Sequence, residues 1–158
     1  MKKLIKNYTT TVDAFRTISE IEQILVENGA TGIAKDYKDG KIVALYFRII
    51  HNDKTLPFRL PAKIKEAFTA LYGDKKYDLW DQEKNNRRKS EDYAQAERVA
   101  WRVAKTWIEA QITFVNLDQA KLAEVFFSYF MYGNQTMFEH MDQANFKLPQ
   151  LPEAREKV

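Results

Sequence analysis

Three basic residues in the segment 97–111 follow one another at helical spacing. Arg98, Arg102 and Lys105 are separated by four and then three residues, so an α-helix places all three on one face. Cations in such a row can each neutralise a phosphate of a nucleic acid backbone. Four more cations stand shortly before the row, in the segment 84–89. The sequence therefore predicts nucleic-acid contacts made by Arg98, Arg102, Lys105, Arg87 and Arg88.

An ordinary solvated helix face is the alternative explanation for these cations. Between residues 74 and 105, nine Lys and Arg residues stand against seven Asp and Glu residues, so this region is nearly neutral. Glu109 also continues the cationic row by one more helical step. Surface helices commonly carry mixed charge of this kind on their polar face, and both interpretations remain open at this point.

A second candidate surface is one face of the predicted strand 41–50. The apolar residues that alternate along this strand are Val43, Leu45, Phe47 and Ile49. If helices cover that face, Tyr46 and Arg48 point the other way, and Arg59, Lys35 and Tyr37 could join them. Aromatic and basic side chains on an open sheet face are suited to stacking and steering a single strand. The alternative is that the second half of the chain covers this face as well.

No pattern typical of a catalytic, metal or cofactor site is found in the chain. The only histidines are His51, in a predicted turn, and His140, in "FEHMD", whose spacing matches neither a zinc-protease helix nor a calcium loop. Cysteine is absent. None of the five glycines belongs to a phosphate-binding loop, and no serine lies in a GxSxG turn. We therefore expect a protein that is not an enzyme and that has no cofactor or metal.

An aromatic run, "VFFSYFMY", occupies residues 125–132. Its six aromatic and methionine side chains are too many for one helical stripe, so some must reach a second layer of the core or a partner. Interfaces are enriched in aromatic residues and methionine. Core packing remains the alternative for each residue, but a homo-oligomer is an expectation. The predicted interface residues are Phe127, Phe130, Met131 and Tyr132.

Residues 1–73 have the pattern of an α-β-β-β-α unit that would position the sheet-face residues. Thr17 and Glu20 have capping-box spacing at the start of the first helix, which Asn28-Gly29 should end. Asp39-Gly40 predicts a tight hairpin turn, and residues 51–55 predict another turn. Pro57 lacks a backbone N–H, which favours an edge strand. The second helix is expected over residues 62–72, with Gly73 as its stop.

The rest of the chain is predicted to be a helical unit that shares one core with the first half. Residues 74–91 read as a charged connector loop, and helical periodicity runs from about Asp92 to about Val115. A further helix through the aromatic run would be capped by Asn116 or Asp118. A short final helix precedes a frayed tail, residues 146–158, so the helical unit spans 92–145. The expected fold class is α+β with a small antiparallel sheet.

Composition sets the broad class of the chain. It has 158 residues, 45% of them hydrophobic and 13% aromatic, which is enough apolar mass for a real core. The formal net charge of +3 permits, but does not demand, contact with nucleic acid. No segment resembles a signal peptide, and no apolar run approaches the roughly 18 residues of a membrane span. We expect a cytoplasmic protein without membrane contact.

Four segments resemble a family of small uncharacterised proteins from bacteriophages and other mobile elements. They are "RTISEIEQILVENGA", "FRLP", "AERVAWRVAKTWIEAQ" and "AEVFFSYFM", in that order within residues 16–132. The resemblance implies a phage gene expressed in a bacterial cytoplasm, and no functional residues. Work in that setting divides between handling viral DNA and countering host defences. The first expectation is a non-enzymatic accessory protein that binds single- or double-stranded nucleic acid in replication or recombination. The alternative is an interaction protein that binds a host defence protein or its nucleotide signalling ligand.

Overall fold

The computed structural model describes residues 4–76 and 82–147 and has the predicted α+β fold. Three antiparallel strands form one sheet in the order β1-β2-β3, and a second, two-stranded sheet pairs β4 with β5. The elements in chain order are α1 (Ala14–Glu27), β1 (Ala30–Lys38), β2 (Lys41–His51), β3 (Lys54–Pro61), α2 (Ile64–Tyr72), α3 (Gln82–Asn116), α4 (Leu122–Val125), the short 3-10 helix η1 (Phe127–Tyr129), β4 (Met131–Tyr132), β5 (Gln135–Thr136) and α5 (Met137–Gln143).

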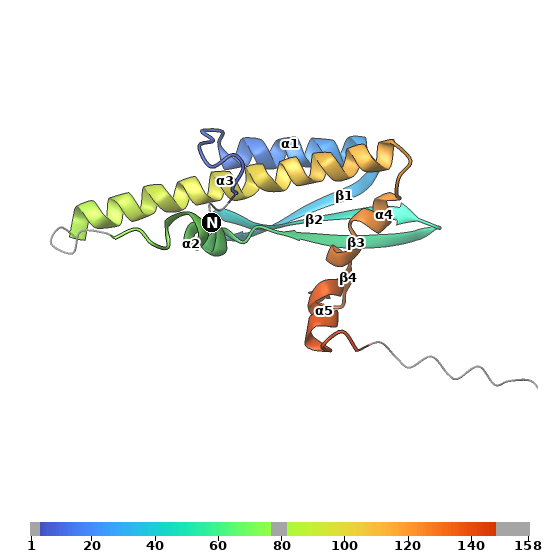
Figure 1. Ribbon diagram of the computed structural model, residues 1–158. Helices are drawn as coiled ribbons and strands as arrows, with labels where there is room; N and C mark the ends of the chain where they lie inside the picture. The colour runs from blue at the N-terminus through green and yellow to red at the C-terminus, as the bar shows by residue number, and fades with distance from the viewer. Residues whose placement is uncertain (1–3, 77–81, 148–158) are drawn as a thin grey trace, which may run out of the picture.

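The helices α1 and α3 lie side by side over one face of the three-stranded sheet (Figure 1). The first turns of α3 extend beyond α1, and α2 packs against this half of α3. After α3 the chain passes α4 and η1 to β4, β5 and α5, which lie beside β3. An antiparallel bridge joins Phe58 of β3 to Phe130. Strand β3 carries Pro57 at the edge of the sheet, as its missing N–H predicts.

Two tight turns connect the three strands, as predicted. Asp39 and Gly40 have φ angles of 51° and 73°, and Asn52 and Asp53 have φ angles of 49° and 60°. Two-residue hairpin turns with positive φ at both positions match the right-handed twist of the strands they join. Asn, Asp and Gly adopt this conformation at the lowest cost. The turn chemistry therefore fixes the register of the sheet.

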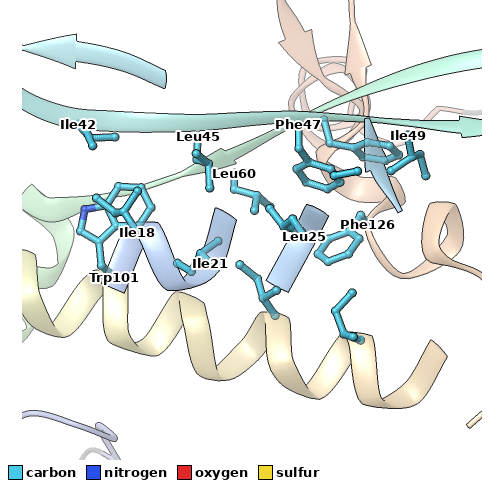
Figure 2. Close-up of a cluster of buried hydrophobic side chains, with 14 of the residues drawn as sticks. Ile18, Ile21, Leu25, Ile42, Leu45, Phe47, Ile49, Leu60, Trp101 and Phe126 are labelled. Atoms are coloured by element: carbon cyan, nitrogen blue, oxygen red, sulfur yellow. The ribbon is translucent and has the colours of Figure 1, made fainter. Parts of the chain in front are cut away.

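A register shift in β2 changes which residues face the helices. The strand pairs Ala44 with Asp36 but Ile42 with Tyr37, so one extra residue of β2 lies between the two pairs. Such a bulge reverses the alternation of side chains beyond it. Ile42 is consequently buried and points toward the helices with Leu45 (Figure 2), whereas Val43, predicted to lie in the buried row, is only half-buried.

The hydrophobic core lies between the sheet and the two long helices, and both halves of the chain contribute to it (Figure 2). Each contributing helix shows its apolar residues at helical spacing on the face toward the sheet. None of the helices in residues 4–76 and 82–147 is long and apolar enough to cross a membrane. The central buried residues are Ile18, Ile21 and Leu25 of α1, Leu45, Phe47 and Ile49 of β2, Phe58 and Leu60 of β3, Trp101, Ile108 and Ile112 of α3, and Phe126.

The predicted capping box at Thr17 and Glu20 is wrong. Helix α1 begins one turn earlier, where the side chain of Asp13 accepts a hydrogen bond from the backbone N–H of Phe15. Thr17 is fully buried inside the helix. Asp is as good an N-cap as Thr, and the earlier start lets Ala14 join the buried stripe. Asn28 caps the other end and Gly29 follows with a φ of 111°, as predicted.

The charged segment predicted as a connector loop over residues 74–91 is largely helical. Residues 77–81 lie outside the described part of the chain, but α3 begins at Gln82 and continues without interruption to Asn116. This segment lacks periodically spaced apolar residues because the first turns of α3 extend past the core. It is nevertheless rich in Gln, Glu, Lys and Arg, which are strong helix formers. The intrinsic propensity of these residues therefore explains the helix better than periodicity does.

The single long helix predicted through the aromatic run is also wrong. Asp118, a predicted N-cap, has a φ of 55°, and α4 instead begins after Lys121 and ends after four residues. The chain then turns through η1 into β4. This path brings Phe126 and Phe130 against the sheet, where a straight helix would leave part of the run in solvent. The predicted short final helix is present as α5, closed at its start by a capping box between Thr136 and Glu139.

Candidate nucleic-acid interface

The cationic row on α3 is paired with other side chains. Nη1 of Arg102 lies 2.8 Å from a carboxylate oxygen of Glu20 on α1. Nζ of Lys105 contacts the carboxylate of Glu109 and lies 3.6 Å from that of Glu20. Arg98 donates hydrogen bonds to the side-chain oxygen of Gln95. Two of the three cations predicted to contact phosphates, Arg102 and Lys105, are therefore neutralised by acidic side chains where α1 packs against α3.

Glu20 is the centre of this ion-pair cluster. It accepts from Arg102 and from Arg16, whose Nε lies 3.2 Å away, and Lys105 adds a third positive charge. The hydrogen bond from Arg102 is the largest effect that lowers the pKa of Glu20 below its ordinary value of 4.5. A lowered pKa means that the charged carboxylate is favoured in the folded state over the unfolded state.

The Glu20→Gln substitution should therefore destabilise the protein by a pH-dependent amount. The stabilising effect of the carboxylate is fully present above its unfolded pKa and is lost as pH falls through the lower folded value. We expect a difference of about 0.2–1 kcal/mol at pH 7, since the cluster is partly exposed. The difference should shrink between pH 5 and pH 3. Urea unfolding at several pH values measures it, with Glu83→Gln as an exposed control, and a difference that does not vary with pH would rule out this role.

The outer face of the three-stranded sheet is open where Tyr46 and Arg48 lie. The hydroxyl of Tyr46 donates to Asp36 on β1 at 2.8 Å, and this hydrogen bond raises the pKa of Tyr46 above its ordinary value of 10.0. Arg48 is exposed, and its side chain lies against Gly32 on β1. A Cβ atom added at Gly32 would lie only 2.5 Å from Nε of Arg48. Together with Pro57 these residues line a shallow groove of about 300 Å³.

Two of the additional sheet-face candidates are held by acidic partners. Lys35 points to the helix side instead, where its Nζ lies 2.5 Å from a carboxylate oxygen of Glu22 on α1. Arg59 is on the outer face but contacts Glu139 of α5 at 2.5 Å. The outer face consequently presents Arg48 as an exposed guanidinium beside neutralised charges, which is a weak electrostatic site for a polyanion.

The strongest concentration of exposed cations lies at the end of the molecule where α2 meets α3. Arg87 and Arg88 are exposed on the first turns of α3. Further along α3, a cleft of about 770 Å³ opens between the β1–β2 turn, the start of α2 and Tyr93. We call it the lysine cleft, and its basic lining residues are Lys38, Lys41, Lys63 and Lys65.

Charge is distributed unevenly within the lysine cleft. Nζ of Lys41 lies 2.9 Å from Glu97 and 5.1 Å from the ring centre of Tyr93, so this lysine is anchored. The other three lysines are exposed, and the acidic residues Asp39 and Glu66 share the lining. Lys89 lies one helical turn before Tyr93 and therefore on the same face of α3. The site combines one paired ammonium group with three exposed ones.

The wider end of the molecule is basic as well. The segments 38–41, 62–76 and 82–98 together contain eleven Lys and Arg residues against seven Asp and Glu residues. Asp78 and Asp81, outside the described residues, reduce the excess of four positive charges to two. Because the whole chain carries only +3, most of its net charge belongs to these segments. Sequence periodicity did not identify the four lysines of the cleft. In the sequence, Lys38 and Lys41 merely flank the hairpin turn, and Lys63 and Lys65 merely stand at the start of α2.

The four predicted interface residues divide into two groups. Phe127 and Tyr132 are 55% and 53% exposed, as an interface requires. Phe130 and Met131 are half-buried, and the ring of Phe130 lies 5.8 Å from that of Phe58 and 6.4 Å from that of Phe127. Phe130 therefore connects the exposed aromatic surface to the core.

The two histidines lie on different elements of the described structure. His51 lies at the end of β2, and His140 lies on α5, where its Nδ1 is 3.1 Å from the side-chain nitrogen of Gln135. Within residues 4–76 and 82–147, no group of three or more His, Asp or Glu side chains is arranged to hold a metal ion. Comparisons of the chain with protein family models, with curated proteins and with solved structures found no match.

Proposed function

We propose that this protein binds nucleic acid without catalysis, as an accessory protein of phage or mobile-element replication or recombination in a bacterial cytoplasm. The observation that supports this proposal is the lysine cleft, with exposed Lys38, Lys63 and Lys65 around the anchored Lys41. Arg102 and Lys105, which the sequence predicts to contact phosphates, are already paired with acidic side chains. We therefore assign the phosphate contacts to the lysine cleft instead.

Electrostatics favours the lysine cleft over the other surfaces. Lys38, Lys63 and Lys65 make no ion pair with the residues that the structure describes, so a phosphate can contact them without displacing such a partner. Each contact releases a condensed counterion from the nucleic acid, which makes binding favourable and strongly dependent on salt. Arg87 and Arg88 extend the positive surface beyond the cleft along α3. Arg102 and Lys105 would instead have to exchange Glu20 for a phosphate.

The paired substitution Lys63→Gln and Lys65→Gln tests this proposal. Binding of single- and double-stranded oligonucleotides should weaken, and the slope of log affinity against log salt should become shallower. The loss of two phosphate contacts should reduce the magnitude of this slope by roughly 1.4 for a single strand and by roughly 1.8 for a duplex. Fluorescence anisotropy between low and moderate salt measures both quantities.

The matched control replaces two exposed lysines outside the cleft, Lys54 and Lys147, by glutamine. It makes the same change of net charge, so its slope should stay close to that of the unmodified protein. Equal effects of the two pairs would show that net charge, and not the cleft, governs binding. If neither kind of oligonucleotide binds at low salt, the proposed function is wrong.

A second candidate function is supported by the exposed aromatic residues of the C-terminal part. Phe127, Tyr132, Phe138 and Phe146 are each more than half exposed, and exposed aromatic residues are typical of protein interfaces. In this alternative the protein binds a host defence protein through these residues. A pull-down from the bacterial host with and without nuclease separates the alternatives, since a protein partner stays bound after nuclease treatment.

A further inference from the structure

A second cleft, of about 780 Å³, lies where α5 and the β4–β5 turn meet β3, away from the lysine cleft. It is built almost entirely from polar and aromatic side chains. Gly133, with a φ of 64°, forms the turn at its rim, and a Cβ there would meet nothing within 4 Å. The lining residues are Arg59, Tyr132, Gly133, Asn134, Gln135, Glu139, His140 and Gln143. We call it the amide cleft.

One wall of the amide cleft is held rigidly and is electrically neutral. Arg59 donates to both carboxylate oxygens of Glu139, at 2.5 and 2.7 Å. The backbone N–H of Thr136 also donates to Glu139, at 2.7 Å, and this hydrogen bond holds the pKa of Glu139 below its ordinary value of 4.5. The carboxylate therefore stays charged opposite the guanidinium. A phosphate would find no excess positive charge at this wall, which favours an uncharged polar ligand.

An aromatic pair forms another wall. The rings of Tyr132 and His140 lie 4.4 Å apart between centroids, tilted by 44°. Gln135 holds the histidine ring through the 3.1 Å contact to Nδ1, which leaves Nε2 as the proton-bearing nitrogen when the amide N–H donates. Tyr132 remains 53% exposed although its ring meets that of His140, so much of this residue is accessible to a ligand. This pair offers an aromatic surface for a flat ligand.

The side-chain amides complete a site for a planar molecule that carries both donors and acceptors. Asn134 and Gln143 each offer two N–H donors and one carbonyl acceptor. A nucleobase has this combination of a flat π face and mixed donors and acceptors at its edge. We propose that the amide cleft binds an unpaired nucleobase, stacked on Tyr132 and hydrogen-bonded by Asn134 and Gln143. This inference rests on the proposed function, and it makes a single strand or an unpaired base the preferred nucleic acid.

The base can belong to a single strand or to a free nucleotide, and two probes distinguish these sources. One probe is adenosine monophosphate, together with the other three ribonucleoside monophosphates. The other is a twelve-nucleotide single strand, compared with an abasic strand of the same length. A disaccharide such as maltose serves as a third probe, since sugars also stack on aromatic rings beside amides.

The Tyr132→Ala substitution should weaken single-strand binding by about 5- to 150-fold, the range found when one base loses its aromatic partner. Tyr132→Phe keeps the ring and should retain most of the affinity. Phe138→Ala removes an equally exposed aromatic residue of α5 that does not line the cleft, and should leave binding unchanged. Binding to the abasic strand should be the same in all variants. Fluorescence anisotropy measures the strands, and side-chain amide shifts of Asn134 and Gln143 in NMR report the site directly.

The results separate this inference from the proposed function. Tyr132→Ala should leave the salt slope intact, whereas the Lys63 and Lys65 substitutions flatten it. If Tyr132→Ala binds the strand as well as the unmodified protein does, the nucleobase site is overturned and the lysine cleft stands. If strands do not bind but a monophosphate binds in a Tyr132-dependent way, the nucleobase site stands and the proposed function fails. Amide shifts caused by maltose and by none of the nucleotides would overturn the nucleobase site.

Discussion

The Phe126→Ala substitution is expected to lower the free energy of unfolding by about 3–5 kcal/mol, the usual cost of removing a buried phenyl ring. Phe126 is 0% exposed and joins the end of α4 to the sheet and to α3. Its ring centre lies 5.2 Å from that of Phe47 and 5.5 Å from that of Trp107, both in edge-to-face geometry. Such pairs stabilise beyond the apolar area they bury.

The neighbouring residue provides a matched control for this prediction. Phe127 is chemically identical but 55% exposed, so Phe127→Ala should cost less than about 1 kcal/mol. Urea unfolding followed by circular dichroism compares the two variants at equal m-value. If both substitutions cost the same, the turn through η1 does not bring the aromatic run into the core as the structure describes.

The elements that sequence predicted well are those specified by short-range chemistry. Asp39, Gly40 and Gly29 have positive φ, which Asp tolerates and Gly adopts without steric cost, so the hairpin and the end of α1 were predictable from local sequence. The apolar period of α3 from residue 92 onward likewise reflects contact with one continuous core. For such features, local preference and tertiary structure agree.

The errors arose where packing between distant segments decides the structure. The bulge that brings Ile42 into the core depends on the pairing of β2 with β1 and leaves no mark in the alternation of β2 alone. The break of the predicted aromatic helix depends on contacts of Phe126 and Phe130 with strands far earlier in the chain. A long helix and a short helix followed by a turn have similar local propensities, so tertiary contacts choose between them.

The candidate site could be predicted only in its residue types. Cations suited to phosphates were visible at Arg102 and Lys105, but their acidic partner Glu20 lies on a different helix, and periodicity gives no information about it. The lysine cleft draws on four elements, β1, β2, α2 and α3, so no spacing rule could assemble it. Tyr132 was identified as an exposed aromatic residue, but its pairing with His140 required the β4–β5 turn and α5 in three dimensions.

The Trp101→Ala substitution should also lower the free energy of unfolding by about 3–5 kcal/mol. Trp101 is 1% exposed and lies at the other end of the core from Phe126, near Ile18 of α1 and Ile42 of β2 (Figure 2). It therefore ties α3 to α1 and to the bulged end of β2. Val103→Ala, two residues further on the more exposed side of α3, should cost less than about 1.5 kcal/mol and serves as the control.

Combining Trp101→Ala with Phe126→Ala tests whether the two ends of the core unfold together. Sites without shared partners add their effects to within about 0.5 kcal/mol, so the pair should cost about 6–10 kcal/mol. A domain of this size has a total stability of only about 5–15 kcal/mol, and the double variant should therefore be largely unfolded at 25 °C. If each single variant instead loses only part of its helical signal in urea, with a reduced m-value, the two ends unfold separately. The lysine cleft near Tyr93 of α3 and the amide cleft beside α5 would then open independently, and a ligand at one site would not stabilise the other.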